Sequence, residues 1–71
     1  MNDNDDIQYD YYDWEGFLCR AMGDIFKGKA ERFTREGWKP AHFFDLKEKG
    51  TPINRIEAKQ LQEKLKTRFA G

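Results

Sequence analysis

The chain has 71 residues, of which 38% are hydrophobic, 37% charged and 15% aromatic, and its formal net charge is zero. This length predicts one domain, and the aromatic content argues against a fully disordered chain. No apolar run approaches the roughly 20 residues of a membrane span, and the acidic start lacks the basic region of a signal peptide. Because Cys19 is the single cysteine, no internal disulfide can form, and we expect a cytoplasmic protein.

Charge is distributed unevenly along the chain. Up to Phe26 there are seven acidic residues and one basic residue, whereas from Lys27 onward there are twelve basic and six acidic residues. A dipolar chain of this kind either presents two faces to different partners or folds its halves against each other. The composition leaves both interpretations open.

The first residues carry acids and then aromatic rings. Residues 1–8 are polar and acidic, which predicts a flexible tail ahead of one domain over residues 9–71. Their Asp-Asn-Asp-Asp run lacks the spacing of an EF-hand loop, and we expect no metal and no cofactor. The tyrosines and the tryptophan that follow alternate with aspartates. These rings either close over the core or form an acidic-aromatic surface, since Tyr and Trp are frequent interface anchors.

Apolar side chains repeat at steps of three and four over residues 14–26. This period predicts an amphipathic helix that supplies most of the core. Gly16, Cys19 and Gly23 fall together on its opposite side. A strip of small residues allows a second backbone to approach closely, either from this chain or from a second copy in a homodimer. The alternative is that exposed positions tolerate glycine at a cost.

Residues 29–37 are expected to form a second helix. Gly37 fits the left-handed position just past a helix end, and Pro40 follows soon after, as is common at such an end. The competing interpretation is a hairpin of residues 31–34 and 38–44 whose turn is Arg35-Glu36-Gly37. Pro40 within its second strand argues against that hairpin.

Two further helices are predicted in the basic half. The third covers residues 40–49 and ends at Gly50, and the last begins at Thr51 as N-cap with Pro52 in its first turn. Its apolar stripe contains Ala58, Leu61, Leu65 and Phe69. Ile53 and Ile56 point elsewhere and are expected to clamp the turn that follows Gly50. The predicted fold is therefore an all-α bundle of three to four short helices; the alternative is an α+β fold with a central hairpin at residues 35–37.

No catalytic motif is apparent, so we expect a non-enzymatic protein. The preferred hypothesis is a protein-binding regulator or inhibitor, of the small type common in phages and mobile elements, which imitates nucleic acid with an acidic-aromatic surface. That surface would contain Asp3, Asp5, Asp6, Asp10, Asp13, Glu15, Tyr11, Tyr12 and Trp14. Exposed aromatic rings would also favour a homodimer. The alternative hypothesis is nucleic-acid binding by the basic C-terminal helix, and its candidate residues are Arg55, Lys59, Lys66, Lys47 and Lys49.

Overall fold

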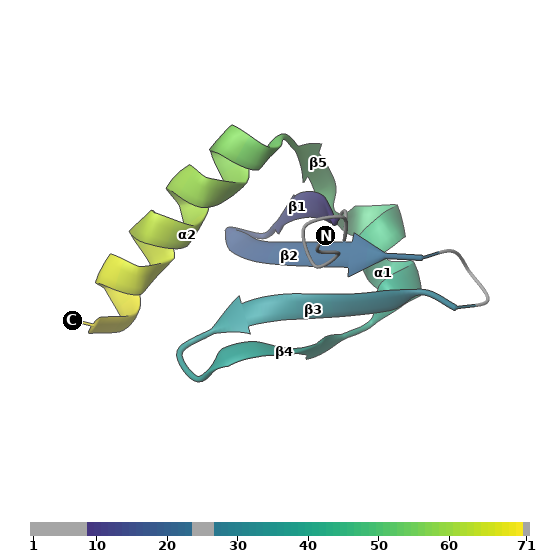
Figure 1. The fold of residues 1–71 in the computed structure, drawn as a ribbon, viewed down its shortest axis with the longest axis horizontal. Coiled ribbons are helices and arrows are strands. Elements are labelled where there is room, and N and C mark those ends of the chain that lie inside the picture. Colours follow the sequence, from purple (N-terminus) through teal and green to yellow (C-terminus); the bar gives the residue numbers. More distant parts are fainter. Residues whose placement is uncertain (1–8, 24–26, 71) are drawn as a thin grey trace, which may run out of the picture.

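A computed structural model describes residues 9–23 and 27–70 as a five-stranded antiparallel sheet with two helices (Figure 1). The predicted all-helical bundle is therefore wrong, and the fold is α+β. The expected tail over residues 1–8 lies outside the described residues. The sheet has the strand order β4-β3-β2-β1-β5. The elements are β1 (Asp10–Trp14), β2 (Phe17–Met22), β3 (Lys29–Thr34), β4 (Gly37–Ala41), α1 (Phe43–Lys49), β5 (Thr51–Ile53) and α2 (Arg55–Ala70).

The two helices cover opposite faces of the sheet. Side chains alternate along a strand, so neighbouring residues of β2 face different helices. Leu18 packs with Ala58 and Leu65 of α2, whereas Cys19 packs with Leu46 of α1. The central strand is consequently buried on both sides, and the core consists of two apolar layers separated by the sheet.

The helix predicted over residues 14–26 is replaced by a β-hairpin. Trp14 pairs with Phe17 across a two-residue turn in which Glu15 and Gly16 have φ angles of 57° and 90°. Positive φ at both positions is the geometry that favours tight hairpins, and Asp13 Oδ1 accepts a hydrogen bond from the Gly16 N–H at 2.9 Å. A strand that is covered on both faces does not alternate between apolar and polar residues. The apolar residues of β2 therefore fitted a helical period. Residues 24–26 lie outside the described residues.

The helix predicted over residues 29–37 is also wrong, and the competing hairpin is present. Strands β3 and β4 pair with Phe33 opposite Trp38, and Gly37 has a φ of 110° after the turn. Thr34 Oγ1 donates a hydrogen bond to the Gly37 carbonyl at 2.7 Å. Pro40 is tolerated because β4 forms an edge of the sheet, where a missing N–H can point away from the ladder.

The C-terminal half differs from the expected pattern at its helix starts. The predicted helix over residues 40–49 is shortened to α1, and the predicted N-cap, Thr51, lies in β5 beside β1. Asn54 caps α2 instead: its Oδ1 accepts from the Glu57 N–H at 2.7 Å, and Glu57 Oε1 accepts from the Asn54 N–H at 3.0 Å. This reciprocal capping box satisfies backbone donors that the helix leaves free.

Replacing Asn54 by alanine should lower the free energy of unfolding by about 1 kcal/mol, because the substitution removes the N-cap acceptor. Urea denaturation followed by circular dichroism measures the change. The control is Thr51→Ala, which alters an exposed strand residue and should cost less than about 0.5 kcal/mol. A larger loss for Thr51→Ala than for Asn54→Ala would contradict the assignment of the cap.

Candidate functional site

Helix α2 covers one face of the sheet and exposes the rest of its circumference. At about 100° per residue, one side of α2 holds Ala58, Leu61, Leu65 and Phe69, which is the apolar stripe expected from the sequence. Leu65 is 1% exposed and Ala58 is 3% exposed, so this side faces the core. The opposite side of a 16-residue helix is left to solvent.

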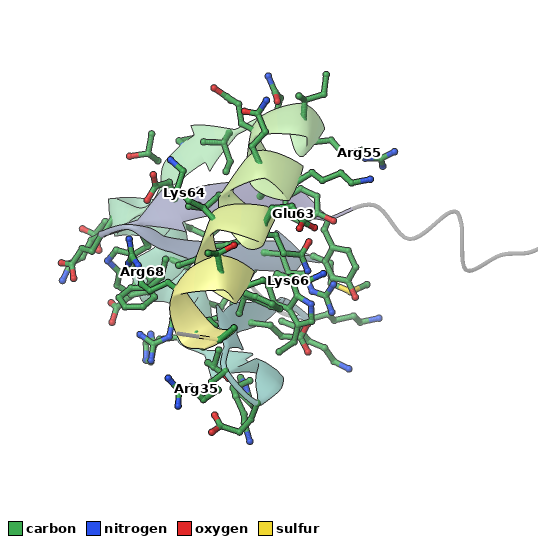
Figure 2. The ribbon with its side chains drawn as sticks, turned by 90° about the vertical axis from the view of Figure 1, so that its left-hand side faces the viewer. Arg35, Arg55, Glu63, Lys64, Lys66 and Arg68 are labelled. Atoms are coloured by element: carbon green, nitrogen blue, oxygen red, sulfur yellow. The ribbon has the colours of Figure 1, made fainter. Side chains whose placement is uncertain are left out.

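Basic side chains occupy both flanks of that exposed side. Arg55, Lys59 and Lys66 lie within about 40° of one another, and Lys64 and Arg68 lie on the other flank, about 180° around the helix. Figure 2 shows Lys64 and Arg68 on one side of α2 and Arg55 and Lys66 on the other. The two groups therefore lie on either side of the exposed face of the helix, which is opposite its apolar stripe. We call the five residues the basic flanks.

Most of these cations have no ion-pair partner among the described residues. Lys66 Nζ lies 3.6 Å from Glu63 Oε2, and both side chains are more than half exposed. Among residues 9–23 and 27–70, the other four members of the basic flanks have no ion-pair partner. Their charges are consequently available to an external anion.

Arg20, unlike the residues of the basic flanks, is held in place by contacts within the fold. Its guanidinium lies 4.1 Å from the centroid of the Tyr9 ring and 4.0 Å from the centroid of the Trp38 ring. Its Nε donates to Glu31 Oε1 at 2.8 Å. Both faces and one edge of the group are thus occupied, and Arg20 links β2 to β3 and β4. Nothing comparable holds the basic flanks.

Positive charge is concentrated on α2, although the chain as a whole has a formal net charge of zero. Helix α2 has five basic and two acidic residues. Glu57, one of these two acids, accepts the hydrogen bond of the cap and, with Asp13, lines a hollow beside Lys64.

The sheet divides the predicted acidic-aromatic surface. Along β1, Asp10, Tyr12 and Trp14 face α1, whereas Tyr11 and Asp13 face α2. Tyr12 is only 6% exposed, and Glu15 lies in the turn. Asp3, Asp5 and Asp6 fall outside the described residues. The described members of that set therefore do not share one face.

The five basic residues predicted from the sequence are also separated. Arg55, Lys59 and Lys66 lie on α2, but Lys47 and Lys49 lie on α1, on the other side of the sheet. Lys47 Nζ donates to Tyr12 Oη at 2.9 Å, and this hydrogen bond raises the pKa of Lys47. Lys64 and Arg68 belong to the site although the sequence analysis did not select them; a complete helical projection of residues 55–70 would have found them.

The small-residue strip expected on the first helix does not form. Gly16 lies in the β1–β2 turn, Gly23 follows β2 with a φ of 85°, and Cys19 is completely buried under α1. Burial raises the pKa of the Cys19 thiol to about 11, against a smaller opposing effect of the Arg32 charge. The thiol therefore stays protonated at neutral pH, which disfavours nucleophilic chemistry.

Comparison of the chain with protein-family models, with curated proteins and with solved structures finds no match. The described residues include no group of three or more His, Cys, Asp or Glu side chains suited to a metal ion. None of the described helices has the length and apolarity needed to cross a membrane. What α2 offers chemically is charge-assisted hydrogen bonding of lysine and arginine to anionic groups.

Proposed function

We propose that the protein binds nucleic acid through the exposed side of α2. The observation that supports this function best is the pair of basic flanks. Their five cations border one face of a long helix, and four of them have no ion-pair partner in the part of the chain that the structure describes. Phosphate groups are the anions that lysine and arginine bind in nucleic acids. A cytoplasmic location, which this function permits, forms part of the proposal.

The fold suits this role because it holds the helix rigidly. The apolar stripe of α2 is fixed against Leu18 of β2 and Phe33 of β3, and the ring of Phe69 lies 6.0 Å from that of Phe33. A helix of 16 residues is about 24 Å long at 1.5 Å per residue. Its side chains can therefore reach several consecutive phosphates without ordering a flexible segment at the moment of binding.

We prefer this proposal to the hypothesis that the acidic-aromatic residues bind a protein partner. The described residues of that set lie on both faces of the sheet, and Tyr12 is buried. By contrast, all five residues of the basic flanks lie on α2, and the four that Figure 2 labels lie on the two sides of its exposed face. A protein that binds a nucleic acid needs its positive charges on one side of the molecule. The charges of α2 meet that requirement.

Binding to a fluorescently labelled DNA duplex of mixed sequence should weaken steeply with salt. Five phosphate contacts predict a slope of about −4.5 for log K against log salt concentration, since each contact contributes about −0.9. Fluorescence anisotropy at several salt concentrations measures this slope. The variant Lys64→Gln/Arg68→Gln removes two contacts and should reduce the slope to about −2.7.

The matched control is Arg32→Gln/Lys39→Gln, which removes the same charge from the sheet face opposite α2. Arg32 and Lys39 are paired across β3 and β4, and their substitution should leave the slope within about one contact of the original value. Absence of DNA binding, or an equal effect of the two double variants, would refute α2 as the binding surface.

A further inference from the structure

A row of uncharged and acidic side chains runs between the basic flanks. Ile56, Gln60, Glu63 and Thr67 are spaced by four, three and four residues, which places them in one line along a helix. By the same projection, this row lies about 180° from the apolar stripe and about 90° from each flank. Figure 2 shows Glu63 on the same side of the ribbon as Lys66, whose Nζ lies 3.6 Å from Glu63 Oε2. We call these four residues the outward row.

Ile56 is the large apolar member of this row. It is 70% exposed, so it does not clamp the turn before the helix, as its position in the sequence had suggested. It adds one apolar group, in line with Gln60, to a face of the helix that is bordered by the cations of the basic flanks.

Resting on the nucleic-acid-binding function above, we propose that α2 enters the major groove of B-form DNA and that its outward row contacts base edges. The groove is about 12 Å wide and admits an α-helix, whose diameter with side chains is about 10–12 Å. The basic flanks then face the phosphate backbones on both sides of the groove. The major groove of an RNA duplex is deep and narrow, so double-stranded RNA does not fit this arrangement.

The outward row contains groups that distinguish base pairs in the major groove. The amide of Gln60 can pair with the N6 and N7 atoms of adenine, and the carboxylate of Glu63 can accept from cytosine N4. Thr67 Oγ1 donates to the Glu63 carbonyl at 3.2 Å, which leaves its methyl group for an apolar contact. The thymine methyl group is the complementary apolar feature of the groove for Ile56 and Thr67.

Selection from a pool of DNA duplexes with a randomised segment tests this proposal. We expect an enriched sequence that binds more tightly than its scrambled duplex and than an RNA duplex of the same sequence. Gln60→Ala should reduce the preference over the scrambled duplex by about 5- to 150-fold, the range for one bidentate base contact. Ile56→Ala should reduce preference at an adjacent base pair. Circular dichroism confirms that each variant folds.

The controls separate this inference from the proposed function. Lys64→Gln/Arg68→Gln should weaken binding to the enriched and scrambled duplexes by the same factor, because phosphate contacts carry no sequence information. Salt-sensitive binding without any enriched sequence, equal binding of the RNA duplex, or unchanged preference in both row variants would overturn the groove assignment while leaving nucleic-acid binding intact. Failure to bind any DNA at low salt would overturn both.

Discussion

Replacing all five basic flank residues by glutamine should lower the affinity for DNA about thirty-thousandfold at 0.1 M salt. Five contacts at about 0.9 each correspond to about 4.5 decades of affinity relative to 1 M salt. Glutamine keeps a high helix propensity, so α2 should remain helical, which circular dichroism verifies. Anisotropy titration with a labelled duplex measures the loss. The substitutions are Arg55→Gln, Lys59→Gln, Lys64→Gln, Lys66→Gln and Arg68→Gln.

The control for this variant removes three charges from the other side of the sheet. Arg32→Gln/Lys39→Gln/Lys49→Gln lowers the net charge of the protein but leaves α2 unchanged. Only the weaker, screened long-range attraction should be affected, so affinity should fall less than about tenfold. If the α2 variant kept its affinity within that factor, the helix would not be the binding surface.

Leu18→Ala should lower the free energy of unfolding by about 2–5 kcal/mol, the range for removing a buried leucine side chain. Leu18 is 1% exposed and lies at the centre of the layer between β2 and α2. In a domain of this size, the loss is a large share of the total stability. The midpoint of thermal unfolding should therefore fall by at least about 10 °C. Calorimetry or circular dichroism measures it.

Ile56→Ala is the natural comparison for the core substitution. Ile56 is of similar size but 70% exposed, so its truncation should change the free energy of unfolding by no more than about 0.5 kcal/mol. A cost as large as that of Leu18→Ala would mean that Ile56 stabilises the fold, and the argument for its role in base contact would fail. A small cost is what its exposure predicts and leaves the side chain available for a base contact.

The stability of the sheet and the orientation of α2 are linked. Leu18 holds the helix by its apolar stripe, and the same contact fixes which residues of α2 point outward. The other apolar layer, which contains Leu46 of α1, is packed closely at Gly50. Gly50 lies so near Leu46 and Tyr12 that an added Cβ would approach the Leu46 carbonyl oxygen to 2.7 Å. Both helices are thus seated on a strand that is buried on both faces.

Much of the candidate site was predictable from local sequence. The helical period of residues 55–70 appears as an apolar stripe, and α2 confirms it because one face of a surface helix packs on a core while the others stay polar. The clustering of Arg55, Lys59 and Lys66 follows from the same geometry. The turn at Arg35-Glu36-Gly37 was visible as an alternative, since glycine suits the positive φ found there.

The sequence by itself determined the basic amphipathic C-terminal helix. Tertiary structure alone decided that residues 10–22 form a hairpin, because β2 is covered by a helix on each face and so has no alternation that local patterning can detect. It also separated Lys47 and Lys49 from the basic residues of α2. Which charged residues share a face depends on how the sheet is covered, and no period along the chain contains that information.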